Sequence, residues 1–159
     1  MNRRVVITGV GTVNPLGNDA DSFWEALIAG KSGIGKITQF DTSEFSVDIA
    51  GEVKDLDQSD YFDSGETRRM DRYTILALIA AMQAMDDCGI DADSLDPGRS
   101  GALVGSGIGG IITFEEQTRA LINRGPRRVS PYFVPMMISD IAAGYISMRY
   151  NLKGPNYAV

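Results

Sequence analysis

The sequence predicts an α/β protein with a mainly parallel sheet, and three observations indicate this class. Short apolar segments that suit strands, such as 5–8 and 100–105, are followed by stretches with helical periodicity. The clearest helical stretch, 67–87, is apolar on all sides in its middle, which is typical of a central buried helix. Most of the 18 glycines stand in short clusters at segment boundaries. This alternation of strands and helices favours a layered α/β fold.

The first third of the chain is predicted to hold two strands, at 5–8 and 48–53, and one helix between them. Asp19 or Asp21 could cap that helix, because an aspartate in this position accepts hydrogen bonds from the first free N–H groups. The helix would cover 22–29 and bury one apolar face, made by Phe23, Trp24, Leu27 and Ile28.

The rest of the chain is predicted to alternate helices with strands. Gly89 would end the long helix, since glycine adopts the left-handed conformation that follows a helix. Small residues in the last helix, Ala142, Ala143 and Gly144, would let another backbone approach closely. In order, we expect a helix at 67–87, a buried strand at 100–105, a helix at 111–123, a loop at 124–135, a helix at 136–150 and a strand from 156.

Composition excludes several functions. The net charge of −6 argues against a nucleic-acid partner bound through overall basicity. No apolar run approaches the roughly 18 residues of a membrane span. The one cysteine, Cys88, excludes an internal disulfide and fits a reducing cytoplasm. With no histidine, these residues cannot complete a Ser-His, Cys-His or His-metal site.

A glycine-rich segment, 105–110, matches the G-x-G-x-x-G pattern of dinucleotide-binding proteins. It follows a predicted strand and precedes a predicted helix, as that pattern requires. The acidic residue expected about twenty positions later is missing, because 127–131 reads Arg-Arg-Val-Ser-Pro. Nucleotide binding is therefore disfavoured, and the glycines would serve a tight turn or leave room for a ligand.

Two basic clusters contrast with the acidic composition. One is Arg68, Arg69 and Arg72 at the start of the long predicted helix; the other is Arg124, Arg127 and Arg128. Arginines at a helix N-terminus oppose its dipole, so local stability does not explain the first cluster. From the residues alone, a solvated surface and a docking site for an acidic partner are equally favoured.

Ordered motifs along essentially the whole chain resemble the β-ketoacyl-acyl carrier protein synthases. Ile108 between the glycines and the Ser-Pro-Tyr-Phe run at 130–133 favour the elongating branch, synthase II. The motifs that carry the resemblance are Arg4-Val5-Val6-Ile7-Thr8-Gly9-Val10-Gly11, Pro15-Leu16-Gly17-Asn18, Gly30-Lys31-Ser32-Gly33-Ile34, Phe40-Asp41-Thr42, Arg69-Met70-Asp71, Gly105–Gly110, the run from Gly125 to Pro135, and Gly154-Pro155-Asn156.

The resemblance implies a thiolase-like layered α-β-α-β-α fold and a cytoplasmic enzyme of fatty acid elongation. Such enzymes use no cofactor or metal in a decarboxylating Claisen condensation. A cysteine takes the acyl chain from acyl carrier protein, and malonyl-carrier protein then supplies the attacking carbanion. That cysteine follows the strand that begins at Asn156, and the two histidines come later. We therefore expect residues 1–159 to form the N-terminal part of the N-terminal domain, without catalytic residues and without the C-terminal domain.

The resemblance also assigns supporting residues. Gly107 and Ile108 match the loop that lines the acyl pocket, and Phe133 matches the residue that closes the partner's pocket across a homodimer interface. That interface would involve 130–159. The expected docking site for acyl and malonyl carrier protein consists of Arg68, Arg69, Arg127 and Arg128.

One departure and one alternative accompany this interpretation. Gly65 and Glu66 stand where a further basic residue is common, so carrier docking could be weaker or arranged differently. A polyketide ketosynthase and a non-catalytic chain-length factor share the fold and remain alternatives.

Overall fold

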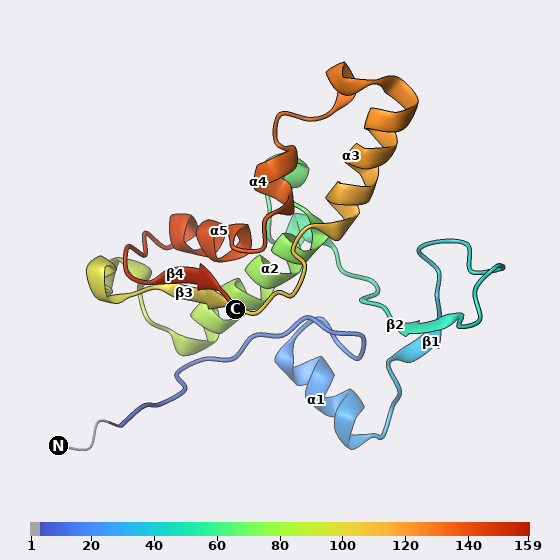
Figure 1. Ribbon diagram of the computed structural model, residues 1–159. Coiled ribbons are helices and arrows are strands. Elements are labelled where there is room, and N and C mark those ends of the chain that lie inside the picture. Colours follow the sequence, from blue (N-terminus) through green and yellow to red (C-terminus); the bar gives the residue numbers. More distant parts are fainter. Residues whose placement is uncertain (1–3) are drawn as a thin grey trace. The chain divides into compact units, whose positions relative to one another are not determined.

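The computed structural model describes residues 4–159, which fall into two compact units (Figure 1). Unit 1 comprises the described residues up to Tyr61 together with Ile79–Gly89. Unit 2 comprises Phe62–Leu78 and Ile90–Val159. The long helix α2 (Arg72–Cys88) contributes its first part to unit 2 and its second part to unit 1.

Unit 1 contains the helix α1 (Ala20–Ile28), the short 3-10 turn η1 (Gln58–Asp60) and an antiparallel pair of strands. The Asp19 carboxylate accepts a hydrogen bond from the Ser22 N–H at 2.7 Å, so the predicted helix and its aspartate cap are confirmed. The predicted apolar face is wrong, because Trp24, Leu27 and Ile28 are exposed and Ala26 is the buried residue. Helical spacing identifies residues on one face, but only a neighbouring element can bury them.

The strands of unit 1 are β1 (Ile34–Lys36) and β2 (Ile49–Gly51), with Gly35 opposite Ala50. β2 confirms the strand predicted at 48–53. β1 was not predicted, since its Ile-Gly-Lys sequence has no strand pattern. The predicted strand at 5–8 is wrong. Those residues are exposed, 94% in the case of Val5, and no strand in residues 4–159 pairs with them.

Polar side chains of α2 fix the N-terminal segment within unit 1. Gln83 Oε1 accepts a hydrogen bond from the Thr12 N–H at 3.0 Å, and its Nε2 donates to Asn18 O at 2.6 Å and to Tyr61 Oη at 3.0 Å. Asp87 accepts from the Val10 N–H at 2.8 Å. The segment is thus held in place by hydrogen bonds and not by sheet pairing.

Helix α2 begins later than predicted. Two of the arginines expected in its first turn, Arg68 and Arg69, lie in a separate 3-10 turn, η2 (Glu66–Arg69), and Met70 is extended; the third, Arg72, is the first residue of α2. After this extended residue, Asp71 O accepts the Ile75 N–H at 3.2 Å and starts the helix. Gly89 has φ +61°, which is the left-handed conformation predicted to follow the helix.

The sheet of unit 2 is a parallel pair, β3 (Ala102–Val104) and β4 (Asn156–Ala158), with Leu103 opposite Tyr157. Both predicted strands are confirmed, but β3 is not buried on both faces, because Leu103 is exposed. Between these strands lie α3 (Ile111–Arg124), the 3-10 turn η5 (Pro126–Arg128), α4 (Phe133–Met137) and α5 (Ile141–Arg149); two further 3-10 turns, η3 (Ala92–Ser94) and η4 (Pro97–Arg99), precede β3.

The core of unit 2 forms around α5, which lies against both strands (Figure 1). Ala142 and Ala143 are fully buried, and the Asn156 side-chain amide donates to Ala143 O at 3.0 Å. The predicted close approach is confirmed in part: α5 packs against both strands at the two alanines, but a Cβ added at Gly144 would meet the Ile141 side chain and not another backbone. The predicted single helix at 136–150 is wrong, since residues 138–140 separate α4 from α5 and Ile138 is extended.

Candidate functional site

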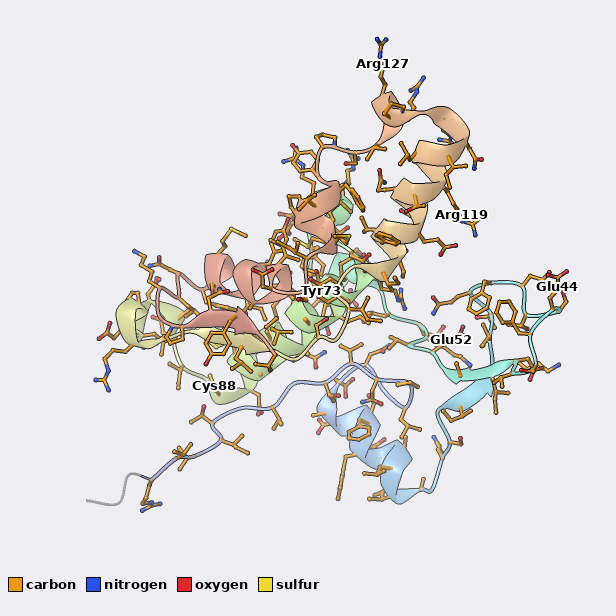
Figure 2. All side chains as sticks on the ribbon, viewed as in Figure 1. Glu44, Glu52, Tyr73, Cys88, Arg119 and Arg127 are labelled. Atoms are coloured by element: carbon orange, nitrogen blue, oxygen red, sulfur yellow. The ribbon has the colours of Figure 1, made fainter. Side chains whose placement is uncertain are left out.

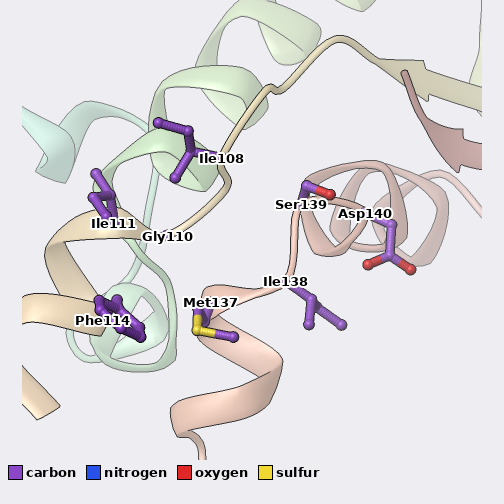
Figure 3. A pocket seen from close by; sticks show the side chains of 8 residues that line it. All are labelled: Ile108, Gly110, Ile111, Phe114, Met137, Ile138, Ser139 and Asp140. Atoms are coloured by element: carbon purple, nitrogen blue, oxygen red, sulfur yellow. The ribbon is translucent and has the colours of Figure 1, made fainter. Parts of the chain in front are cut away.

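Unit 2 contains an open cavity of about 560 Å³ between the start of α3 and the break between α4 and α5. Figure 3 shows one wall contributed by the end of the glycine-rich loop and α3, and a second wall contributed by the segment from α4 to α5. Most of the lining is apolar. The lining residues are Ile108, Gly110, Ile111 and Phe114 on the first wall and Met137, Ile138, Ser139 and Asp140 on the second.

The two walls meet directly at the glycine-rich loop. The Gly110 N–H donates to Met137 O at 2.9 Å, and a side chain at Gly110 would collide with Met136 O. Gly109 has φ +80°, which favours glycine, and its N–H donates to Ser106 Oγ at 3.0 Å. Of the roles proposed for these glycines, the structure supports a tight turn at Gly109 and, at Gly110, a close approach to the backbone of Met136 and Met137.

The first turn of α2 lies behind both walls. The Asp71 carboxylate accepts the Thr113 N–H of α3 at 2.7 Å, and the Tyr73 hydroxyl donates to Ile138 O at 2.5 Å. Burial raises the pKa of the Tyr73 hydroxyl above its ordinary value, which keeps it protonated as a donor. Sequence reasoning missed both residues because each bond joins segments far apart in the chain.

The residues predicted for an acyl pocket are only partly brought together. Ile108 lines the cavity and is 70% exposed. Phe133 does not line it, but its ring centroid lies 6.2 Å from that of Phe114, which does. Gly107 lies one residue before Ile108 and is not among the lining residues. The i, i+3 spacing of Ile111 and Phe114 was the one sequence signal that pointed to the rest of the α3 wall.

The predicted docking arginines are exposed on two turns of unit 2. Arg68 and Arg69 lie on η2, and Arg127 and Arg128 on η5. Figure 2 shows the Arg127 side chain projecting outward beyond the end of α3. The Arg69 guanidinium carbon lies 4.1 Å from the centroid of the Tyr132 ring, so η2 contacts the segment that follows η5. Such cation–π contacts fix the direction of an arginine without neutralising it.

The acidic neighbour that departs from the expected pattern has its own partner. Glu66 Oε1 lies 3.1 Å from Arg149 Nη1. Within residues 4–159, Arg68, Arg127 and Arg128 form no ion pair.

The described residues also bear on a reactive thiol, a metal site and a membrane span. Cys88 is half-buried and its thiol lies 3.0 Å from Met85 O, which fits a structural side chain. The described residues contain no cluster of three or more His, Cys, Asp or Glu side chains suited to a metal ion. Among residues 4–159, no helix combines the length and the apolar character needed to cross a membrane.

Solved structures place this fold among the thiolase-like ketosynthases. The ishigamide ketosynthase/chain length factor superposes with a TM-score of 0.89 at 26% identity over 100% of this chain and 40% of that one. A beta-ketoacyl synthase from Burkholderia phymatum gives 0.79 at 27% identity over 99% of this chain and 39% of that one.

The chain belongs to the beta-ketoacyl synthase N-terminal domain family, whose family model matches residues 2–159. It is 48% identical over 157 residues to 3-oxoacyl-[acyl-carrier-protein] synthase 2 from Staphylococcus aureus. That match covers 99% of this chain and 38% of the relative, so the chain spans well under half of the relative's length.

Proposed function

We propose that this chain is the N-terminal part of a 3-oxoacyl-[acyl-carrier-protein] synthase 2, which condenses an acyl thioester with malonyl-acyl carrier protein in fatty acid elongation. The observation that carries the proposal is the 48% identity to a relative of that name over 99% of the chain. The apolar cavity and the exposed arginines of unit 2 supply the two binding surfaces that such a reaction needs.

The cavity would hold the acyl tail. Each methylene that leaves water for an apolar site contributes about 0.8 kcal/mol, so a cavity lined by Ile108, Ile111 and Phe114 favours a long saturated chain. The nucleophilic cysteine and the histidines of this chemistry would come from sequence beyond these 159 residues, which include one cysteine and no histidine. We therefore expect the 159-residue chain alone to lack condensing activity.

The alternatives are a polyketide ketosynthase and a non-catalytic chain-length factor. They draw on the likeness to the ishigamide ketosynthase/chain length factor, at 26% identity. The elongation enzyme is favoured because the identity to its named relative is much higher. We also propose that the protein is a homodimer through 130–159, where Tyr132, Val134 and Met148 are exposed apolar side chains.

The acyl pocket is tested by Ile108→Phe in the full-length protein. Adding a ring to the lining removes volume, so we expect the accepted acyl chains to become shorter. The measurement is kcat/KM over a series of saturated acyl-carrier thioesters. The matched control is Ile122→Phe, on the same unit and 75% exposed away from the lining residues. If Ile108→Phe retained full activity with long chains, the acyl pocket would lie elsewhere.

Carrier docking is tested by reversing two charges, Arg68→Glu with Arg69→Glu. Exposed charges act mainly on encounter, so we expect KM for acyl-carrier protein to rise about tenfold at low salt, with less effect at high salt. The control reverses two other exposed charges of unit 2, Arg99 and Lys153. An unchanged KM at low salt would rule out a docking role for η2.

A further inference from the structure

Asp71, directly before α2, and Tyr73, in its first turn, each reach one wall of the cavity with a side chain that does not line it. Lining residues determine what an acyl chain touches. The separation of the two walls must be fixed by something else, because α3 and the break between α4 and α5 are distinct segments. A direct hydrogen bond also joins the walls, from the Gly110 N–H to Met137 O, at one end of the cavity.

Asp71 holds the α3 wall. Its side chain is 4% exposed, and its two carboxylate oxygens accept from the Thr113 N–H at 2.7 Å and the Tyr73 N–H at 3.2 Å. Thr113 stands between Ile111 and Phe114 and is buried. The carboxylate thus joins the first turns of two helices, where the N-terminal ends of their dipoles favour a negative charge. A rotation of α3 would break this bond and move both lining residues.

Tyr73 holds the opposite wall. Its hydroxyl donates to Ile138 O at 2.5 Å, and Ile138 is the extended residue that ends α4. The same carbonyl also accepts a longer bond of 3.4 Å from the Ile141 N–H. A carbonyl at a helix break is free to turn, so the phenol fixes both its direction and the position of the Ile138 side chain.

We propose that Asp71 and Tyr73 are positioning residues that set the width of the cavity and thereby the length of acyl chain that it accepts. This inference rests on the proposed function. The brace, defined as Asp71 and Tyr73, works because both residues stand at the start of α2, where the Tyr73 N–H donates to the Asp71 carboxylate. Both walls are therefore bonded to the same rigid element. Without either bond, a wall relaxes and the cavity discriminates less sharply between chain lengths.

The test compares full-length variants Tyr73→Phe and Asp71→Asn with the parent protein. The readout is the ratio of kcat/KM for a long and a short saturated acyl-carrier thioester. This ratio is independent of the fraction of folded enzyme, so a merely structural loss does not change it. We expect the ratio to change by about three- to tenfold toward equal use of both chains, the range set by one hydrogen bond.

Tyr145→Phe is the matched control, because its hydroxyl also donates to a backbone carbonyl, Arg69 O, at 3.3 Å. Tyr145 does not line the cavity, so its removal should leave the ratio unchanged. A second readout is intact mass after loading with equimolar long and short acyl thioesters, which reports the same preference without the condensation step.

Ile108→Phe, measured in parallel, distinguishes failure of the brace from failure of the acyl pocket itself. If it shifts the ratio while Tyr73→Phe and Asp71→Asn do not, the brace is refuted and the acyl pocket stands. If Ile108→Phe also leaves the ratio unchanged, the cavity does not hold the acyl chain, and the brace is refuted together with that part of the proposed function. The proposal would also be overturned if Tyr145→Phe changed the ratio of kcat/KM as much as the brace variants do.

Discussion

Units 1 and 2 are stabilised by different means. In unit 2 the long helix, α5 and the parallel strands bury apolar side chains such as Leu78, Ala142 and Ala143. In unit 1 Ala26 and Ile79 are buried, but large apolar side chains such as Trp24 and Ile28 are exposed. The segments around them are held by hydrogen bonds that side chains such as Gln83 and Glu52 accept. Apolar content alone therefore does not locate a core, since burial requires a second element with a complementary face.

The same contrast applies to function. All the lining residues of the cavity and all four predicted docking arginines belong to unit 2. A binding wall has to keep its shape against the ligand, and packed helices provide that rigidity. Unit 1 contributes none of the predicted site residues.

The largest expected effect tests this contrast with one substitution in each unit. Leu78→Ala in unit 2 removes a side chain that is 1% exposed and leaves a cavity, so we expect a loss of about 3 kcal/mol in the free energy of unfolding. Leu27→Ala in unit 1 removes a side chain that is 46% exposed and should cost less than about 0.5 kcal/mol. Urea denaturation of both variants measures the difference, and equal losses would contradict the assignment of Leu78 to the core of unit 2 and of Leu27 to the surface of unit 1.

A smaller effect is expected at the polar centre of unit 1. Gln83→Ala leaves the Thr12 N–H, Asn18 O and Tyr61 hydroxyl without the partner that α2 provides, which should cost about 2 kcal/mol. Hydrogen exchange of the Thr12 amide reports the loss locally. Gln58→Ala is the control, because this side chain makes none of the three bonds. Unchanged protection of Thr12 in Gln83→Ala would show that other contacts hold the segment.

The smallest effect concerns pH and Glu52, the buried carboxylate beside β2 (Figure 2). Hydrogen bonds from the Thr38 N–H at 3.0 Å and the Thr38 hydroxyl at 2.8 Å lower the pKa of Glu52 below 4.5. The bonds favour the charged form of Glu52. Their contribution to the free energy of unfolding is therefore complete above pH 4.5 and is lost as the pH falls through the lowered pKa.

Thermal unfolding between neutral pH and pH 3 measures this dependence. Glu52→Gln should flatten the profile of unit 1, and Thr38→Val, which removes the hydroxyl donor, should flatten it in part. A profile that is identical in the parent and Glu52→Gln would assign the acid sensitivity to other groups.

Local signals predicted much of the fold correctly. The aspartate cap of α1, the glycine after α2 and the extent of α3 all depend on residues close in sequence. The apolar segments of β3 and β4 were also predicted, although the pairing that makes them strands joins distant residues. The expected strand at 5–8 failed because a strand exists only with a partner. The expected helix at 136–150 failed because its interruption at Ile138 involves a bond from Tyr73, far away in the chain.

In the candidate site, too, features set by residues close in sequence were predicted and those set by distant contacts were not. Ile108 was predicted from its motif and lines the cavity, but the second wall at 137–140 and the supporting Asp71 and Tyr73 were not. Motifs report residues that touch a ligand. The residues that hold those contacts in place interact across the fold, and no pattern within one segment records them.

The parallel pairing of β3 with β4 has a consequence for the order in which unit 2 folds. The connection between these strands contains α3, η5, α4 and α5, so the ladder closes only when the ends of a long segment meet. The entropy of that closure is lost before the pairing is gained, which makes non-local contacts slow to form. The Ser106 N–H donates to Val159 O at 2.9 Å at the end of the ladder, where the chain enters the glycine-rich loop. We therefore expect the helices, whose bonds are local, to form first, and the loop that carries Ile108 to reach its final position among the last parts of unit 2.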